Sequence, residues 1–302
     1  MSPRRTRFPT ATALSIVLAL CVSAPAGAGP WTVPKGEFRV KTALFYQDTG
    51  QRFAATGGFG TATGESFSHG DRVPYFFNGR STTLAVFTEL DYGIASRLDV
   101  RLVVPFFHTE FVDAVDPDRS PSTGFGDLRG FLQLRVTGGP WVTGLRAGIK
   151  APVGKDQGFG DAEVVPTGEG QWDFELGAAT GHSFYPAPAF VTAELGYRIR
   201  TENTENGFRP GNEWIASADA GFAYTDGGWG GRLRWDWLYG EAIRAAGIRL
   251  DQRREIMLVT PAMVYRLVGG VELEGGVQIP LRGRDYPAGV VGTVAVSYRF
   301  SP

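Results

Sequence analysis

The chain has 302 residues, with 30 basic and 31 acidic side chains for a formal net charge of −1, and it is rich in glycine (42) and in aromatic residues (7 Trp, 10 Tyr, 21 Phe). This balance, without a basic block, offers no surface for nucleic acid, so we expect no nucleic-acid partner. A single cysteine, Cys21, excludes a disulfide framework.

The first 28 residues have the pattern of a secretory signal peptide. Three basic residues open it: Arg4, Arg5 and Arg7. An apolar run of 12 residues follows at 11–22, and Ala26-Gly27-Ala28 supplies the small residues that signal peptidase requires. The run is shorter than the roughly 20 residues that span a bilayer as a helix. An uncleaved anchor and a lipoprotein modified at Cys21 are the alternatives. After cleavage, residues 29–302 would form one domain with 27 basic and 31 acidic residues.

Twelve segments then alternate apolar and polar residues, the period of a β-strand with one apolar face. Between Ser81 and Tyr92, for example, Leu84, Val86 and Leu90 share one face and the acidic residues lie on the other. We expect strands at 36–47, 80–93, 97–108, 126–136, 141–151, 171–183, 189–200, 212–225, 229–240, 253–266, 270–281 and 289–300.

The connections between these segments alternate in length. Those after even-numbered strands are short, whereas those after odd-numbered strands are longer, with 48–79 the longest. Outer-membrane barrels place short turns in the periplasm and long loops outside. The predicted fold is therefore an all-β, twelve-stranded antiparallel transmembrane β-barrel in a Gram-negative outer membrane. A soluble periplasmic barrel is the alternative, but its strands would be about 5–6 residues long, roughly half the length seen here.

The charged faces of the strands are expected to line the lumen, because one Arg or Lys at the lipid midplane costs about 2–4 kcal/mol. A register slip of one residue would turn these charges outward. The lumen-lining candidates are Glu89, Asp91, Arg101, Arg129, Arg135, Arg146, Lys150, Asp173, Glu175, Glu194, Arg198, Arg232, Arg234, Asp236, Glu272 and Glu274. Their mixed signs predict weak ion selectivity. Twelve strands lie between filled eight-stranded barrels and open porins of 16–18 strands, which predicts a narrow or partly blocked pore.

Aromatic residues collect near the strand ends, as in the girdles of membrane barrels. The expected periplasmic girdle holds Tyr92, Trp141, Tyr224, Trp229, Tyr298 and Phe300. The expected outer girdle holds Tyr46, Phe106, Trp172, Trp214, Trp237 and Tyr239.

The first long loop carries six aromatic residues among many Gly, Thr and Ser residues. They are Phe53, Phe59, Phe67, Tyr75, Phe76 and Phe77. Long loops in compact proteins are usually functional or disordered. We expect either a gate that folds into the barrel mouth and meets an apolar substrate, or a surface loop without function. Only about seven residues separate the cleavage site from the first strand, so no plug domain is expected.

Several short motifs resemble one family of membrane proteins. They are Tyr92-Gly-Ile-Ala-Ser-Arg-Leu-Asp-Val-Arg-Leu-Val-Val-Pro105, Gly124-Phe-Gly-Asp127, Pro152-Val-Gly154, and the run from Tyr265 through Pro280-Leu-Arg-Gly283. Their order is similar to that of outer-membrane transporters grouped as "meta-pathway of phenol degradation", and more distantly to long-chain fatty-acid channels. The resemblance covers most of the mature chain. It implies a passive channel for small, often aromatic or apolar, compounds.

The expected partners are outer-membrane lipid and lipopolysaccharide, a small-molecule solute, and the barrel-assembly machinery. That machinery recognises the aromatic end of the last strand in many outer-membrane barrels. Here Phe300 is followed by Ser301 and Pro302, a departure from that ending.

No catalytic constellation stands out, so we expect no enzyme, no metal and no cofactor. His69, His108 and His182 fall at different places along the predicted barrel. An outer-membrane hydrolase, built for instance on His108 with Asp113, Asp116 and Asp118, is one alternative, and a structural barrel without transport is another. The repeat of Gly-Phe-Gly-Asp at 124–127 and 158–161 is interpreted as a pair of rim turns. Its alternative is a cation or lipopolysaccharide-bridging site of Asp127, Asp161 and Glu163.

Overall fold

The computed structural model describes residues 29–60, 65–156, 165–222, 228–245 and 247–301. The predicted signal peptide, the girdle residue Tyr224, and the second Gly-Phe-Gly-Asp motif with Glu163 lie outside the described residues. None of the helical turns within these ranges is long and apolar enough to cross a bilayer.

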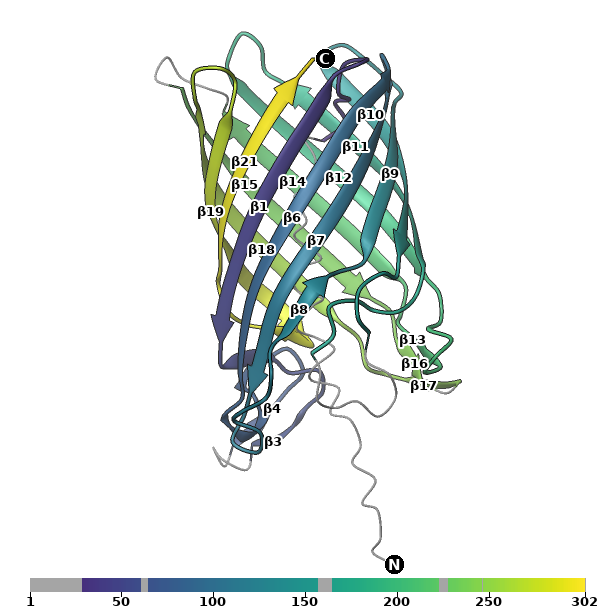
Figure 1. Cartoon of the computed structure of the whole chain (residues 1–302), viewed down its shortest axis with the longest axis vertical. Coiled ribbons are helices and arrows are strands. Elements are labelled where there is room, and N and C mark those ends of the chain that lie inside the picture. The colour runs from purple at the N-terminus through teal and green to yellow at the C-terminus, as the bar shows by residue number, and fades with distance from the viewer. Residues whose placement is uncertain (1–28, 61–64, 157–164, 223–227, 246, 302) are drawn as a thin grey trace, which may run out of the picture.

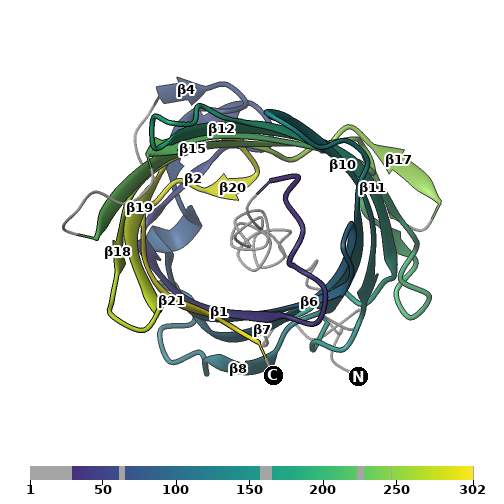
Figure 2. The ribbon, with the colours of Figure 1, turned by 90° about the horizontal axis from the view of Figure 1, so that it is seen from above.

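Twelve antiparallel strands close into a barrel, which confirms the predicted fold class (Figure 1). Each pairs with the next barrel strand along the chain, and the last pairs with the first to complete the ring in Figure 2. Each end lies within four residues of its predicted position. The barrel strands are β1 (Phe38–Thr49), β6 (Arg80–Ala95), β7 (Leu98–Val112), β9 (Leu128–Arg135), β10 (Trp141–Ala151), β11 (Asp173–Ser183), β12 (Ala189–Arg200), β14 (Glu213–Phe222), β15 (Trp229–Gly240), β18 (Glu255–Arg266), β19 (Glu272–Arg284) and β21 (Val291–Phe300).

The two ends of the barrel differ. One end, called the turn end here, carries the short connections and Phe300, whereas the loop end carries the long connections and three small sheets (Figure 1). These small sheets contain β2 (Gln51–Phe53), β5 (Arg72–Pro74) and β20 (Tyr286–Pro287), then β3 (Gly58–Gly60) and β4 (Glu65–Phe67), then β13 (Phe208–Arg209), β16 (Ile243–Ala245) and β17 (Ile248–Leu250). A short 3-10 turn, η1 (Phe76–Asn78), follows β5.

The strand predicted at 126–136 is observed as β9, which begins two residues later. A separate short strand that was not predicted, β8 (Ser122–Phe125), pairs with the loop-end half of β7 just before it, with Gly126 and Asp127 between the two. At this break the Asp127 carboxylate accepts hydrogen bonds from the N–H groups of Gly154 (3.1 Å) and Glu169 (2.9 Å). The connection between β10 and β11 is thereby fastened to the barrel wall.

The outward face of the barrel is apolar. Leu84, Leu132, Phe174 and Val296 are all exposed, and Leu132 and Phe174 retain 50% and 47% of their surface. On the other face of the same strands, charged residues such as Glu89 and Asp173 are buried. This alternation is expected of a barrel that faces lipid outside and a polar lumen inside.

Aromatic rings pair on the outside near both ends. At the turn end, Trp229 packs on Tyr265 with ring centroids 4.6 Å apart. At the loop end, Tyr197 packs on Trp214 at 4.8 Å. Two bands of this kind mark the interfaces of a membrane barrel.

Part of the inner wall is apolar, although charged side chains were expected to line the lumen. Phe45, Phe87 and Phe107 project inward from β1, β6 and β7 and stack edge to face, with centroids 5.2 and 5.7 Å apart. A second inner cluster joins Leu238, Ile256 and Leu258 to residues of the loops. The inner wall is thus divided between two apolar patches, one on β1, β6 and β7 and one on β15 and β18, and charged walls elsewhere.

Candidate functional site in the barrel lumen

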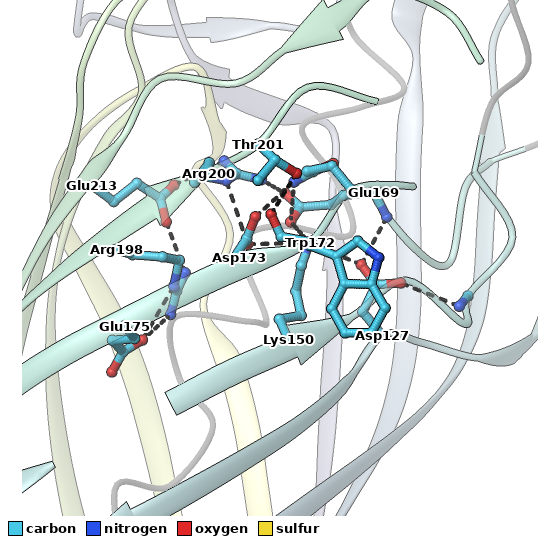
Figure 3. Close-up of polar contacts among 12 residues, drawn as sticks. Asp127, Lys150, Glu169, Trp172, Asp173, Glu175, Arg198, Arg200, Thr201 and Glu213 are labelled. Atoms are coloured by element: carbon cyan, nitrogen blue, oxygen red, sulfur yellow. Dashed lines mark hydrogen bonds and ion pairs between the residues drawn. The ribbon is translucent and has the colours of Figure 1, made fainter. Parts of the chain in front are cut away.

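A buried lysine lies in the charged wall of the lumen, near the loop end. Lys150 on β10 reaches three carboxylates, with Nζ 2.6 Å from Glu169, 3.0 Å from Asp127 and 3.2 Å from Asp173 (Figure 3). All four side chains are less than a tenth exposed. Buried charges are stable only when paired in this way, because desolvation of each ion costs several kcal/mol.

Arginines extend this cluster around the wall. Arg200 pairs with Glu169 and lies 3.1 Å from Glu213, while Arg198 bridges Glu213 (2.7 Å) and Glu175 (2.9 Å). Figure 3 shows this chain of contacts along β11, β12 and β14. Arg254, from the connection before β18, also pairs with Glu213. Acid and base therefore alternate from strand to strand.

The carboxylate of Glu169 lies outside the barrel strands, in the connection before β11. Burial alone would raise the pKa of Glu169, but Arg200, Lys150 and Arg254 outweigh it and hold the pKa well below its ordinary value of 4.5. A carboxyl with a depressed pKa contributes stability above its unfolded pKa and loses that contribution as pH falls through the folded value.

We therefore expect Glu169→Gln to lower thermal stability by a constant amount above about pH 5. The difference from wild type should shrink as pH falls further, because the wild-type carboxyl then also becomes neutral. Thermal unfolding of both proteins in detergent across this pH range would check this. A difference that stays constant into strong acid would contradict the assignment.

Two further ion clusters complete the charged lumen. Toward the turn end, Asp91 lies between Arg39 (2.6 Å) and Arg101 (2.5 Å), next to Glu89. The second cluster adjoins it through β1 and contains Lys41, Asp219, Arg232, Arg234, Asp236 and Glu274, which lie on β1, β14, β15 and β19.

The structure places the predicted lumen-lining residues on the inner face, mostly within these clusters. Arg129 is buried, and Arg146 bridges Glu175 and Glu194. Arg135 and Glu272 lie nearer the turn end, where Arg135 donates to the Ser96 carbonyl and Glu272 pairs with Arg266.

The residues before β1 enter the lumen at the turn end, where the dark purple segment crosses the ring in Figure 2. This N-terminal segment, residues 29–37, is held by side chains of the wall. The Val33 N–H donates to Asp99 at 2.9 Å, and Gln133 Nε2 donates to the carbonyls of Gly29 and Trp31 at 3.0 and 3.2 Å. No plug domain was expected, and in the described part of the chain these few residues lie inside the lumen at the turn end.

Three inward-facing glycines make room for the N-terminal segment. A Cβ on Gly93 would lie 2.0 Å from the Pro34 carbonyl oxygen, and one on Gly181 would lie 2.8 Å from the Trp31 ring. A Cβ on Gly144 would lie 3.5 Å from the Pro30 oxygen. The wall is therefore shaped to the backbone of this segment.

The loop at 48–79 is folded into the loop end, with β2 and η1 inside the ring in Figure 2. Of its predicted gate residues, Phe53 and Tyr75 are 2% and 3% exposed and belong to the two inner apolar clusters. Phe76 and Phe77 are 61% exposed, and Phe67 is intermediate. Phe59 lies in β3, and its side chain lies outside the described residues.

A cavity opens at the loop end between the charged cluster and the outer connections. It is lined by Glu169, Gln171, Arg200 and Arg254 on one side and by Phe208, Pro210 and Ile243 on another. Gln171 donates to Glu169 and Asp173, which fixes the orientation of its amide. Its buried Oε1 accepts no hydrogen bond within the described part of the chain.

The histidines do not converge. His108 contacts Thr123 at 2.7 Å near the loop end, and His182 stacks on Trp141 at the turn end. Asp113 accepts hydrogen bonds from the N–H groups of Val115 and Asp116. Within the described ranges no group of three or more His, Cys, Asp or Glu residues could hold a metal ion. Asp127, a candidate for cation bridging, pairs with Lys150 instead.

The comparisons identify relatives in family and in fold. A family model described as "Putative MetA-pathway of phenol degradation" matches residues 50–300. The COG4313 outer membrane channel from Pseudomonas putida F1 is similar, with TM-score 0.72 and 16% identity over 91% of this chain and 99% of that chain. The beta domain of the Bordetella autotransporter BrkA is similar at TM-score 0.50 and 13% identity, covering 87% of this chain and 99% of that one.

The Pseudomonas putida toluene transporter TodX gives TM-score 0.41 and 11% identity over 88% of this chain and 90% of that chain. No curated protein matches the sequence significantly. The fold is that of outer-membrane barrels.

Proposed function

Since the chain belongs to the family described as "Putative MetA-pathway of phenol degradation", we propose that it is a passive outer-membrane channel for small aromatic or apolar compounds. In this proposal residues 1–28 direct export, the turn end faces the periplasm and the loop end faces outside. The channel needs no cofactor. One protein of similar fold, from Pseudomonas putida F1, is an outer membrane channel.

The observation that carries the proposal is the division of the lumen. Phe53 and Tyr75 of the loop fill apolar positions at the outer mouth, against walls that contain Phe111 and Leu238. Tyr75 lies edge to face on Phe111, with centroids 5.3 Å apart. These loop side chains occupy places that an aromatic solute of similar size would take once the loop lifts.

The charged part of the lumen favours neutral solutes. Each cation in the Lys150 and Arg198 clusters has a carboxylate within about 3 Å, so little net field remains to attract an ion. Gln171, whose Oε1 accepts no hydrogen bond within the described residues, lines the cavity and can accept one from a hydroxyl on an otherwise apolar ring. Phenolic compounds combine both features.

Uptake into proteoliposomes tests the proposal. We expect phenol and toluene to enter vesicles that contain the protein faster than empty vesicles. The protein should accelerate their uptake by a larger factor than it accelerates the uptake of arabinose. Tyr75→Ala should raise aromatic uptake several-fold, because loss of a buried aromatic ring costs about 3–5 kcal/mol and loosens the loop. Phe77→Ala, an exposed neighbour in the same loop, is the matched control and should leave uptake unchanged.

The structural barrel without transport makes the opposite prediction. Vesicles that contain correctly folded protein would then take up these solutes no faster than empty vesicles. Equal effects of Tyr75→Ala and Phe77→Ala would contradict the gate at 48–79 while leaving the channel itself in place.

A further inference from the structure

Three arginines lie side by side on a small sheet at the loop end. In the sheet of β13, β16 and β17, Arg209 is paired with Arg244, and Arg244 is paired with Arg249. Side chains directly opposite one another on antiparallel strands have Cβ atoms about 4.5–5.5 Å apart. The three guanidinium groups therefore project from one face in a row.

Such a row is unfavourable without an anion, because like charges directly opposite each other destabilise a sheet. In the described part of the chain Arg209 donates to the carbonyl of Arg200, and none of the three arginines forms an ion pair. Most arginines of the lumen, in contrast, have a carboxylate partner. The row therefore differs from the lumen in its charge pairing.

The arginines border a recess of about 160 Å³ that also contacts Asn212 and Glu241. Both of these residues bond to the hydroxyl of Tyr197, Asn212 as donor and Glu241 as acceptor, each at 3.0 Å. Tyr197 belongs to the aromatic pair with Trp214 that marks the outer membrane interface. The recess therefore lies on the outside of the barrel, directly above the lipid-facing wall.

The sheet has a second, apolar face. Ile248 and Leu250 flank Arg249 on β17 and are 66% and 42% exposed on the face opposite to it. Figure 1 shows the sheet at the loop end, and in Figure 2 β17 projects beyond the ring. A projecting element with cations on one side and aliphatic side chains on the other fits the boundary between acyl chains and charged headgroups.

We propose that Arg209, Arg244 and Arg249 bind a phosphate group of lipopolysaccharide in the outer leaflet. The planar guanidinium presents paired N–H donors that match two phosphate oxygens, and three cations together neutralise a dianionic phosphate. The site rests on the outer-membrane location proposed above, but not on transport. Its chemistry would also accept free phosphate, and the position above the aromatic band favours the lipid.

Binding of lipid A to the full-length protein in detergent tests the site. We expect Arg209→Gln/Arg244→Gln/Arg249→Gln to weaken binding of diphosphorylated lipid A at least tenfold. The matched control removes the same charge from three exposed arginines that have carboxylate partners, as Arg80→Gln/Arg266→Gln/Arg282→Gln. That control should change affinity less than twofold. Equal losses in the two triple variants would overturn the proposal.

Two further arms separate the sources of phosphate and guard against misfolding. Lipid A from which both phosphates have been removed should bind wild type as weakly as diphosphorylated lipid A binds the triple variant. Inorganic phosphate that binds wild type as tightly as lipid A would overturn the lipid assignment. If the triple variant does not fold, wild-type affinity must still fall with added salt, and a salt-independent affinity would refute the site. Solute uptake by the triple variant reports separately on transport.

Discussion

Replacing Lys150 with methionine should lower the free energy of unfolding by about 3–5 kcal/mol, the range seen when one member of a buried ion cluster is removed. Lys150 is the shared partner of Asp127, Glu169 and Asp173, and Asp127 also fastens the connection between β10 and β11. Methionine fills a similar volume but leaves three buried carboxylates short of a cation. Urea unfolding from detergent or lipid vesicles, followed by electrophoretic mobility, measures the change.

Lys155→Met is the control. It removes the same charge, but Lys155 is exposed and lies in the connection after β10. We expect it to change stability by less than about 0.5 kcal/mol. Lys150→Arg keeps the charge and should recover part of the loss. If Lys150→Met and Lys155→Met are equally stable, the cluster does not hold the lumen together.

Displacement of the N-terminal segment should have the largest effect on permeation. In Gly93→Ala the new methyl group would overlap the Pro34 carbonyl, whose oxygen lies 2.0 Å from the Cβ position. Neither a Cβ nor a carbonyl oxygen can rotate away as a flexible side chain can. The N-terminal segment must therefore move out of its position in the lumen. Single-channel recordings in planar bilayers should show conductance several-fold above wild type.

Gly275→Ala is the matched control, because a Cβ on Gly275 would meet no atom within 4 Å. It should behave as wild type. Combined substitution of Asp99 and Gln133 by alanine removes the hydrogen bonds to Val33, Gly29 and Trp31 and should also raise conductance. If neither Gly93→Ala nor the Asp99 and Gln133 double variant changes the conductance, the N-terminal segment does not limit permeation.

Period-two alternation was sufficient to predict the strands of this barrel and which faces point outward. The reason is energetic: exposing Asp173 or Arg198 to lipid costs several kcal/mol, so one register is far more favourable than its neighbour. The alternation at Leu84, Val86 and Leu90 carries this information without any knowledge of partners. The family resemblance, read from short motifs in order, was confirmed by the family match.

Other features depend on contacts that a local pattern does not encode. Glu169 lies in a segment predicted as a connection, and Arg254, predicted at the start of the strand 253–266, lies just before β18. Only the folded chain brings them to Lys150 and Glu213. The inward position of Phe111 follows the alternation, but its packing with the loop residue Tyr75 requires the loop to fold inward. The sequence contains one sign that residues 29–37 lie in the lumen, namely the inward-facing glycines Gly93 and Gly181. Without the fold these glycines could not be interpreted.

The ion pair between Lys41 and Glu274 has a consequence for how the cylinder is assembled. It joins β1 to β19 across the intervening β21, passing over the small side chain of Ala295, which is paired with Glu274. Neither charge can be neutralised by this contact until the first and last strands have met. If the seam closed one residue out of register, Lys41 would lose Glu274 and turn toward the lipid, and among the described residues Glu274 would keep only Arg232 as a partner. The ion pair therefore favours the correct register of the last strand pairing, which forms after the hairpins.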